Sequence, residues 1–515
     1  MTREPVTFYI STFFLIALAY FIQVHTFFSP DVGYLLHAAN QILAGEKYGS
    51  DIFETNPPMI LYLYLPACII AKWAAMNVIT VVHLYITFLA VASLSLCYFL
   101  LKKLIKWQDN MMRYSLFYML LFTLFFVPAV AFAQREHILV IFMLPYLLSA
   151  ALALNNQPVH PMLAVLVGTM AGLGFALKPF FLVTPCLIEL YFIIKRRQLF
   201  AWVRIESVVI IGVLMLYFIS IFVSQPDYIN VVLPLVFRYY FSSMAMPWYQ
   251  VILFSNVLFC IAAMLGYFIF HKYDSYSTLG WIIALALAGM LIAFLIPKAP
   301  WYYHVFPALT LALLLIAHFF GQTMSLMIRK RSRPIFLTMD SVILSVGMAI
   351  ILILPVSAYC GMIHYLYRFQ DKQPEKQVAE YINQFPGQHS IACFGLGTPD
   401  CFPLVYDTHS QYAERFPSFW WYTGLRKLEK ESQQKTVLSA QVAKDKKYLI
   451  NCISDDLNKS KAKWVVIDMR NFKESGKNPF NIIHYFSKDE KFRAAWQPYH
   501  YLTSIKSINI YERIS

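Results

Sequence analysis

An acidic segment directly follows the first long apolar run of the chain. Its four carboxylates belong to Asp31, Glu46, Asp51 and Glu54. A charged side chain beside hydrocarbon costs about 2.5–3.5 kcal/mol on insertion scales, so acids are rare at such places. A carboxylate held at a membrane surface could take a proton from a hydroxyl group, and we interpret Asp31 as a candidate general base. The alternative is that these acids only cap helices, since Ser29-Pro30-Asp31 has the composition of a helix start.

Three later turns between apolar runs are also polar. They contain Gln134-Arg135-Glu136-His137, Leu177-Lys178-Pro179, and Lys298 followed by Trp301-Tyr302-Tyr303-His304. A turn that only reverses a helix needs no charge, so these turns, with Tyr34 and Asn56 of the first loop, indicate a polar cavity at one membrane face. Simpler explanations are an ion pair within the first turn, a lysine that reaches lipid headgroups in the second, and an interfacial aromatic belt in the third.

The composition is that of a membrane protein. Of the 515 residues, 59% are hydrophobic and 14% are charged, whereas a soluble domain has about 25% charged residues. The net charge of +14 could suggest a nucleic-acid partner, but much of the Lys and Arg lies in short loops between apolar runs. That distribution sets the orientation of membrane helices, and we therefore expect no nucleic acid among the partners.

The positions of the basic loops predict the topology. If every apolar run crossed the membrane, the basic loop 102–113 would face away from the basic N-terminus. The conflict disappears if the run at 58–76, which begins with Pro57-Pro58 and contains Lys72, lies at the interface or re-enters. We therefore expect a polytopic α-helical protein with about 11 transmembrane helices, a cytoplasmic N-terminus, and amphipathic or re-entrant helices in a first outer loop at 29–77.

The polar C-terminal segment predicts a separate domain. Residues 1–365 form the expected transmembrane domain, and 366–515 an extramembrane α/β domain with strand-like runs at 389–395, 464–468 and 504–511. Cys393 and Cys401 could form a disulfide if this domain lies in an oxidising compartment. The aromatic segment 414–421 could cover the membrane cavity, with Arg415 near the site, or could belong to the domain's own core.

The order of these features resembles the GT-C class of membrane glycosyltransferases, which use lipid-phosphate-linked sugars. The likeness is to bacterial relatives of dolichyl-phosphate-mannose protein mannosyltransferases and to lipid A aminoarabinose transferases. It rests on Pro30-Asp31-Val32-Gly33-Tyr34 after the first helix and on Phe53-Glu54-Thr55-Asn56-Pro57-Pro58 before the edge helix. The chain departs from the pattern at Asn56, where many members have Lys or His. The resemblance covers roughly residues 8–200.

The resemblance implies an inverting transfer of a monosaccharide from a polyprenyl-phosphate donor to a glycan, lipid or protein of the cell envelope. Asp31 would be the general base. The expected phosphate-binding residues are Arg135, Lys178 and Lys298. The expected substrate-binding residues are Tyr34, Glu54, Asn56, Glu136, His137, Trp301, Tyr302, His304 and Arg415. A divalent metal is possible, held by Glu54 with His137 or His304. The protein would lie among the lipids of the bacterial inner membrane, with its active site and C-terminal domain in the periplasm.

Two other functions fit parts of the pattern. A lipid-linked oligosaccharide ligase or polymerase also has a polar outer-face cavity, but would rely on Arg and His without an early loop carboxylate. A transporter or flippase would place polar residues in broken helices at mid-membrane depth. The apolar runs here are almost free of charge apart from Glu189 and Glu206 near their ends, which favours an enzyme over a transporter.

Overall fold

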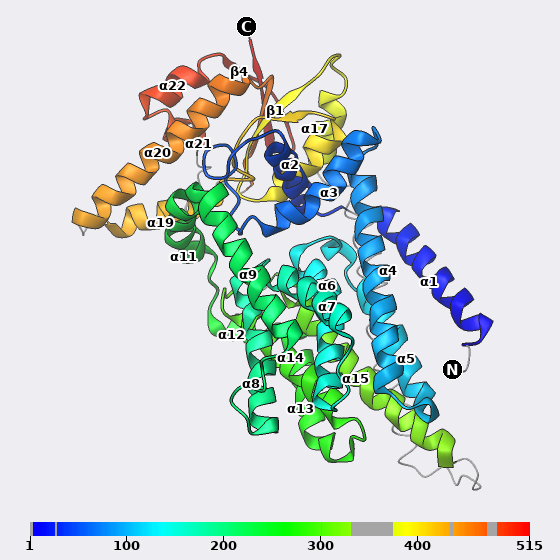
Figure 1. The fold of residues 1–515 in the computed structure, drawn as a ribbon. Helices are drawn as coiled ribbons and strands as arrows, with labels where there is room; N and C mark the ends of the chain where they lie inside the picture. The colour runs from blue at the N-terminus through cyan, green and yellow to red at the C-terminus, as the bar shows by residue number, and fades with distance from the viewer. Residues whose placement is uncertain are drawn as a thin grey trace. The chain divides into compact units, whose positions relative to one another are not determined.

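A computed structural model of the chain describes residues 4–25, 28–299, 301–330, 374–432, 436–470 and 481–514 (Figure 1). The chain divides into two compact units. The helical unit contains Met1–Phe27, Pro58–Ser220 and Met246–Tyr367, and the sheet unit contains Phe28–Pro57, Ile221–Ala245 and Arg368–Ser515. The first outer loop up to Pro57, which we assigned to the transmembrane domain, thus groups with the C-terminal residues.

The helical unit is built almost entirely of apolar helices. They are α1 (Val6–His25), α3 (Met59–Trp73), α4 (Val78–Leu104), α5 (Asn110–Phe125), α6 (Arg135–Leu154), α7 (Pro161–Phe175), α8 (Val183–Arg196), α9 (Ile205–Ser224), α12 (Trp248–Ile252), α13 (Ser255–Phe270), α14 (Ser277–Leu295) and α15 (Tyr302–Lys330). Short 3-10 turns lie between them: η1 (Trp107–Asp109), η2 (Ala129–Ala131), η3 (Pro179–Leu182) and η6 (His271–Tyr273). The boundary between the two units falls within α9, because Ser220 belongs to the helical unit and Ile221 to the sheet unit.

Seven helices of the described chain are long and apolar enough to cross a membrane. This confirms a polytopic α-helical membrane protein. Helix α3, at the run that we expected not to span, has only 15 residues and is not one of the seven. The expected final span at 336–360 lies outside the described residues. Helix α6 is the centre of this unit, because 89% of its apolar window is buried, whereas only 17% is buried in α1 and in α13.

Small residues bring two of these helices into close contact. Gly168 and Gly172 are four residues apart on α7, so they lie on the same face of the helix. A Cβ atom at Gly168 would lie 2.9 Å from the Glu206 carbonyl oxygen, and one at Gly172 would lie 2.8 Å from Cβ of Val213. Glycine pairs at this spacing let membrane helices pack backbone to backbone, and here they fix α9 against α7.

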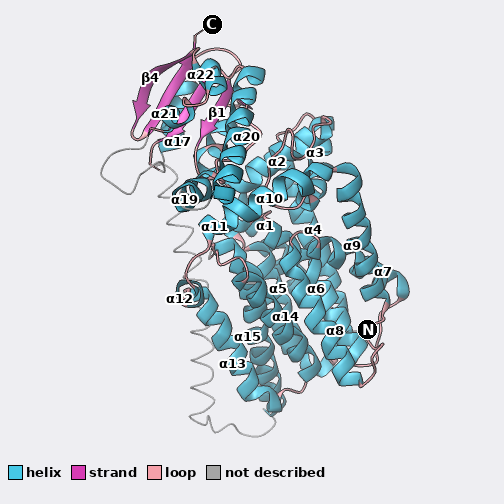
Figure 2. Cartoon of the chain, turned by 90° about the vertical axis from the view of Figure 1, so that its left-hand side faces the viewer, coloured by secondary structure: helices cyan, strands magenta, loops and turns pink. Residues whose placement is uncertain are grey.

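The sheet unit contains a five-stranded mixed sheet (magenta in Figure 2). Its strands are β1 (Ser390–Phe394), β2 (Gln411–Tyr412), β3 (Trp464–Asp468), β4 (Tyr499–Ile505) and β5 (Ile508–Arg513), in the order β2-β1-β3-β5-β4. Strands β1, β2 and β3 are parallel, and β5 pairs antiparallel with β3 and β4. The first two predicted strands are confirmed. The third, at 504–511, was wrong as a single strand, because Lys506 takes a positive φ of 56° and turns the chain into a hairpin.

Helices cover both faces of this sheet. They are α17 (Pro374–Ile382), α18 (Phe402–Asp407), α19 (Tyr422–Ser432), α20 (Thr436–Ser460), α21 (Ile482–Phe486) and α22 (Glu490–Trp496). One face packs Ile391, Trp464 and Ile510 against α17 and α18. On the other face, Phe394 contacts α21 and α22 through Phe486 and Phe492. All five residues of β3 are therefore buried, as expected for a strand covered on both sides.

The aromatic segment 414–421 belongs to the core of the sheet unit. Phe416, Phe419 and Trp421 are completely buried. The Phe419 ring packs on Phe394 and Phe486, with ring centroids 5.0 and 5.8 Å apart. The segment is therefore part of the core of the sheet unit, which confirms the second of the two alternatives that we considered. Aromatic rings bury a large apolar area, which explains why a small domain uses so many of them here.

Part of the first outer loop and a later insertion also belong to the sheet unit. Helix α2 (Pro30–Leu43) packs against α18 and against the 3-10 turn η7 (Thr398–Asp400). The insertion contains η4 (Tyr228–Val232), α10 (Leu233–Leu235), η5 (Val236–Tyr240) and α11 (Phe241–Met244). Backbone N–H of Tyr48 donates to Gln225 Oε1 over 2.9 Å, so the loop and the insertion are joined to each other by a buried hydrogen bond.

Candidate active site

Asp31 lies in the first turn of α2, where a carboxylate interacts favourably with the helix dipole. The helix N-cap is Ser29 and Pro30 is the first helical residue, so Asp31 lies two residues after the cap and is not the cap itself. Its Oδ1 accepts a hydrogen bond from the hydroxyl of Thr398 at the start of η7. The carboxylate is half-buried. The structure thus gives Asp31 a specific side-chain partner that the sequence did not suggest.

A glycine, Gly33, allows the close packing of α2 on α18. A Cβ atom at Gly33 would lie 2.9 Å from the Tyr406 ring. The Tyr406 hydroxyl donates to the Gly33 carbonyl oxygen over 2.9 Å, and the Tyr34 ring packs edge-on against Phe402 at 5.2 Å. These contacts fix the turn of α2 that carries Asp31 relative to the C-terminal residues of the same unit.

Tyr34 and His37 are buried on the same helix as Asp31. The Tyr34 hydroxyl donates to the carbonyl oxygen of Arg415 over 3.3 Å, and burial, together with the negative charge of Glu54, raises its pKa well above the usual value. Burial lowers the pKa of His37 to about 4, so its imidazole is neutral at physiological pH. Neither residue carries a charge near Asp31.

Glu54 and Asn56 form a local hydrogen-bonded turn. Glu54 Oε1 accepts hydrogen bonds from the backbone N–H of Asn56 over 3.0 Å, from the Asn56 side-chain amide, and from the Thr55 hydroxyl over 3.2 Å. The Asn56 carbonyl oxygen in turn accepts from the hydroxyl of Tyr48. Asn56, the departure from the family pattern, therefore anchors Glu54, a use that a longer Lys or His side chain could not reproduce with the same geometry.

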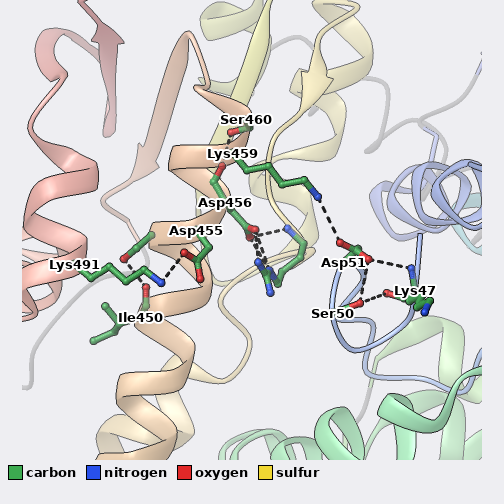
Figure 3. A network of polar contacts seen from close by, with 11 residues as sticks. Lys47, Ser50, Asp51, Ile450, Asp455, Asp456, Lys459, Ser460 and Lys491 are labelled. Atoms are coloured by element: carbon green, nitrogen blue, oxygen red, sulfur yellow. Dashed lines mark hydrogen bonds and ion pairs between the residues drawn. The ribbon is translucent and has the colours of Figure 1, made fainter. Parts of the chain in front are cut away.

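Arg415 contacts the first loop through its backbone, not through its charge. Its carbonyl oxygen accepts from backbone N–H of Phe53 over 2.9 Å. Its guanidinium forms a two-pronged ion pair with Asp456, with Nη2–Oδ1 at 2.8 Å and Nε–Oδ1 at 2.9 Å. Arg–carboxylate pairs of this kind are strong and directional. The loop is also joined to α20 by an ion pair between Lys459 and Asp51, 3.5 Å apart, which is shown in Figure 3 with Asp456.

The polar turns of the helical unit meet around Glu136. Lys178 Nζ donates to Glu136 Oε1 over 2.6 Å, and His304 Nε2 lies 3.8 Å from the same oxygen. Arg135, next to Glu136 at the start of α6, is 4% exposed and Glu136 is 1% exposed. The three turns therefore converge, as their composition indicated. The structure adds that Glu136 already neutralises part of the expected phosphate-binding charge.

The remaining predicted residues of this unit have separate contacts. The Lys298 ammonium lies 4.5 Å from the centroid of the Trp248 ring, a cation–π arrangement. The Tyr302 hydroxyl donates to the carbonyl oxygen of Val127 over 3.2 Å, and Trp301 is 44% exposed.

His137 supports the turn before α6. Its Nδ1 accepts from backbone N–H of Ala133 over 3.1 Å, and its Nε2 lies 2.8 Å from the carbonyl oxygen of Leu124. The ring is completely buried. Ala133 has a positive φ of 64°, which is unfavourable for a residue with a side chain, so the His137 contact stabilises a strained turn. Both nitrogens are engaged, which leaves this imidazole poorly suited to bind a metal.

An acidic cluster in the sheet unit was missed by the sequence reasoning. Glu375, Asp400 and Asp468 are buried, and an oxygen of each lies within 4.8 Å of the others. Arg470 pairs with Glu375 and Asp468. Burial and the neighbouring Asp468 raise the pKa of Asp400 to about 6. The cluster was not predictable because its members are separated by up to 93 residues. It includes neither Glu54 nor His304, the expected metal ligands.

Cys393 and Cys401 are joined by a disulfide, which confirms the pairing that we considered. Cys393 is at the fourth position of β1 and Cys401 immediately precedes α18. The bridge therefore closes the loop that contains Thr398 and Asp400.

Comparison with known proteins shows similarity in structure but not in sequence. No known family model matches the chain, and no curated protein matches its sequence. Two crystal structures of ArnT from Cupriavidus metallidurans are similar to it. The structure bound to undecaprenyl phosphate has 10% sequence identity and a TM-score of 0.58, covering 99% of both chains. The apo structure has 11% identity and a TM-score of 0.59, covering 99% of this chain and 98% of that one.

A third similar structure is the archaeal oligosaccharyltransferase AglB from Archaeoglobus fulgidus, in complex with an inhibitory peptide and a dolichol-phosphate. It has 12% identity and a TM-score of 0.46, and covers 99% of this chain and 75% of that one. The two ArnT comparisons extend over nearly the full length of both proteins, far beyond the residues 8–200 that carry the sequence resemblance. The chain therefore shares the fold of the two ArnT structures over nearly its whole length.

Proposed function

We propose that this protein transfers a monosaccharide from a polyprenyl-phosphate donor to an acceptor of the cell envelope. The observation that carries the proposal is the fold shared from end to end with ArnT, one structure of which holds undecaprenyl phosphate. Asp31 supports the proposal. Its carboxylate lies in the first turn of α2, which follows the first membrane helix, and this is the position that the family pattern requires. The membrane would be the bacterial inner membrane, with the N-terminus in the cytoplasm and the sheet unit in the periplasm.

The chemistry would be a direct, inverting displacement. A hydroxyl oxygen of the acceptor attacks the anomeric carbon, and its proton passes to the Asp31 carboxylate. The bond between the anomeric carbon and the phosphate oxygen breaks, and polyprenyl phosphate leaves with the electron pair. Positive charge stabilises the leaving phosphate. Arg135 and Lys178 are the candidates, with Glu136 and His304 around them to set their orientation, and Lys298 is the third cation.

The expected metal ligands fit a metal poorly. Glu54 Oε1 accepts three hydrogen bonds within its own turn, and His304 Nδ1 is 2.9 Å from the Ala299 carbonyl oxygen while its Nε2 faces Glu136. We therefore derive no step that passes through a metal at these residues.

The buried charges of α8 and α9 do not favour a transporter. Glu189 accepts from Arg204 over 2.6 Å, from the Ser207 hydroxyl over 2.8 Å and from the Tyr146 hydroxyl over 2.7 Å. All three bonds go to Oε1 of Glu189, and they join α8 to α6 and to the start of α9. This is the use of a residue that packs helices together, which favours an enzyme over a transporter.

The test is an assay in proteoliposomes with a labelled polyprenyl-phosphate sugar and extracted envelope acceptors. The wild type should move label from the lipid to an acceptor. Asp31→Asn should lower the rate of transfer by about 10³-fold or more, whereas Asp51→Asn, a matched acid in the same loop, should transfer at nearly the wild-type rate. If the wild type neither binds nor consumes any polyprenyl-phosphate sugar, the proposed function is wrong. If Asp31→Asn transfers normally, only the assignment of the base is wrong.

A further inference from the structure

A disulfide-closed loop of the sheet unit reaches the candidate base. The loop comprises residues 393–401, and the Thr398 hydroxyl in its middle donates a hydrogen bond to Asp31 Oδ1. The two residues are 367 positions apart in the sequence. A hydroxyl that donates to a carboxylate forms a charge-assisted hydrogen bond, which is shorter and stronger than a neutral one.

Several contacts hold this loop in one conformation. Backbone N–H of Cys393 donates to the Glu414 carboxylate over 2.8 Å, and backbone N–H of Gly397 donates to Asp400 Oδ2 over 3.1 Å. A Cβ atom at Gly395 would lie 2.5 Å from Asp400 Oδ2, so the chain can fold this tightly only with glycine there. The disulfide fixes both ends, one on the sheet and the other at α18.

The helix that carries Asp31 packs on the same α18. Tyr406 of α18 donates to the Gly33 carbonyl oxygen, two residues after Asp31. The loop and α2 are therefore both attached to α18. A shift of the loop would change the position of the Thr398 hydroxyl relative to the Asp31 carboxylate. Catalytic groups must be held within about 0.5 Å of their productive geometry.

We propose that Thr398 is a positioning residue for Asp31 and that the disulfide between Cys393 and Cys401 holds it in place. This inference rests on the proposed function, because it takes Asp31 as the base. The hydrogen bond to Oδ1 fixes the plane of the carboxylate, and so the direction from which the acceptor hydroxyl delivers its proton. Thr398 itself does not touch the reacting atoms.

Kinetics of Thr398 variants test the proposal. Thr398→Val keeps the shape of the side chain and removes the donor. It should lower kcat about 10- to 100-fold and leave KM for the labelled polyprenyl-phosphate sugar within about twofold, since donor binding does not use this hydroxyl. Thr398→Ser, which restores the hydroxyl, should restore most of kcat. Thr408→Val is the matched control, because this buried hydroxyl of the same unit bonds Leu404 and Ser410 and should leave kcat unchanged.

A double variant separates positioning from simple loss of structure. On the Asp31→Asn background, Thr398→Val should not lower the residual transfer further, because the group that it positions is already gone. A further drop of the same size would overturn the proposal and indicate a general structural role. Unchanged kcat in Thr398→Val, with Asp31→Asn inactive, would also overturn it but would leave the proposed function standing.

Reduction of the folded enzyme tests the role of the disulfide without a change of sequence. Dithiothreitol should lower kcat of the wild type in the same direction as Thr398→Val, and should have little effect on Thr398→Val itself. Free thiols counted before and after treatment verify that the bridge has opened. Full activity of the enzyme with an opened bridge would contradict this part of the proposal.

Discussion

In the helical unit, the buried carboxylate of Glu136 accepts from the ammonium of Lys178; in the sheet unit, the carboxylate of Asp31 accepts from the neutral hydroxyl of Thr398. An ammonium neutralises its acid and stabilises the folded protein, whereas a hydroxyl orients its acid and leaves the negative charge in place. Two acids in similar sequence settings, each beside an apolar helix, thus have different uses. Glu136 belongs to an ion pair, whereas the described side-chain partner of Asp31 is a hydroxyl that orients its carboxylate.

The largest effect on stability is expected in the helical unit. Glu136→Gln leaves Lys178 buried without its counter-ion, and the loss of one partner of a buried pair costs about 3–5 kcal/mol. Chemical denaturation in mixed micelles would measure the free energy of unfolding. Lys298→Met is the matched control, because its ammonium faces an aromatic ring, and it should cost less than about 1 kcal/mol. If both substitutions lower the free energy of unfolding by the same amount, the ion pair of Glu136 with Lys178 contributes no more to stability than the cation–π contact of Lys298.

A medium effect, dependent on pH, is expected for Asp400 in the acidic cluster. Its folded-state pKa of about 6 lies above the ordinary 3.8. Between these two pH values the Asp400 carboxyl is protonated in the folded protein and ionised in the unfolded chain. The stability that Asp400 contributes is full below about pH 4 and falls as the pH rises to about 6.

Asp400→Asn should therefore be more stable than the wild type at pH 7, by an amount on the order of 2 kcal/mol, and the two should converge near pH 4. Denaturation at a series of pH values between 4 and 7 would measure the difference. A parallel pH dependence in both proteins would show that another group is responsible.

The smallest effect is expected for the ion pair between Lys459 and Asp51. The Lys459 side chain is 76% exposed, and exposed pairs contribute about 0–1 kcal/mol. Lys459→Ala should leave both stability and transfer within experimental error. A loss of transfer with this variant would mean that the loop carrying Asp51 needs α20 to hold it, and would extend the positioning function beyond Thr398.

The sequence predicted the elements whose signals are local. Apolar length predicted the helices, alternating and β-branched runs predicted β1 and β3, and Asp31 after the first helix indicated the candidate base. The hairpin of β4 and β5 was missed, because its turn contains Lys506 and Ser507 where glycine or asparagine is the usual signal. Partners were not predictable. Nothing in the sequence near Arg415 points to Asp456, and Thr398 meets Asp31 only after α2 packs on α18.

The most direct test compares donor binding with transfer in Asp31→Asn. Binding of the labelled polyprenyl-phosphate sugar to the purified variant would be measured by equilibrium titration, and transfer by a single turnover with excess enzyme and saturating acceptor. If Asp31 is the base, the variant should bind the donor with a Kd within about threefold of the wild type, while the rate of transfer falls by about 10³-fold or more. A single-turnover rate close to that of the wild type would contradict the mechanism.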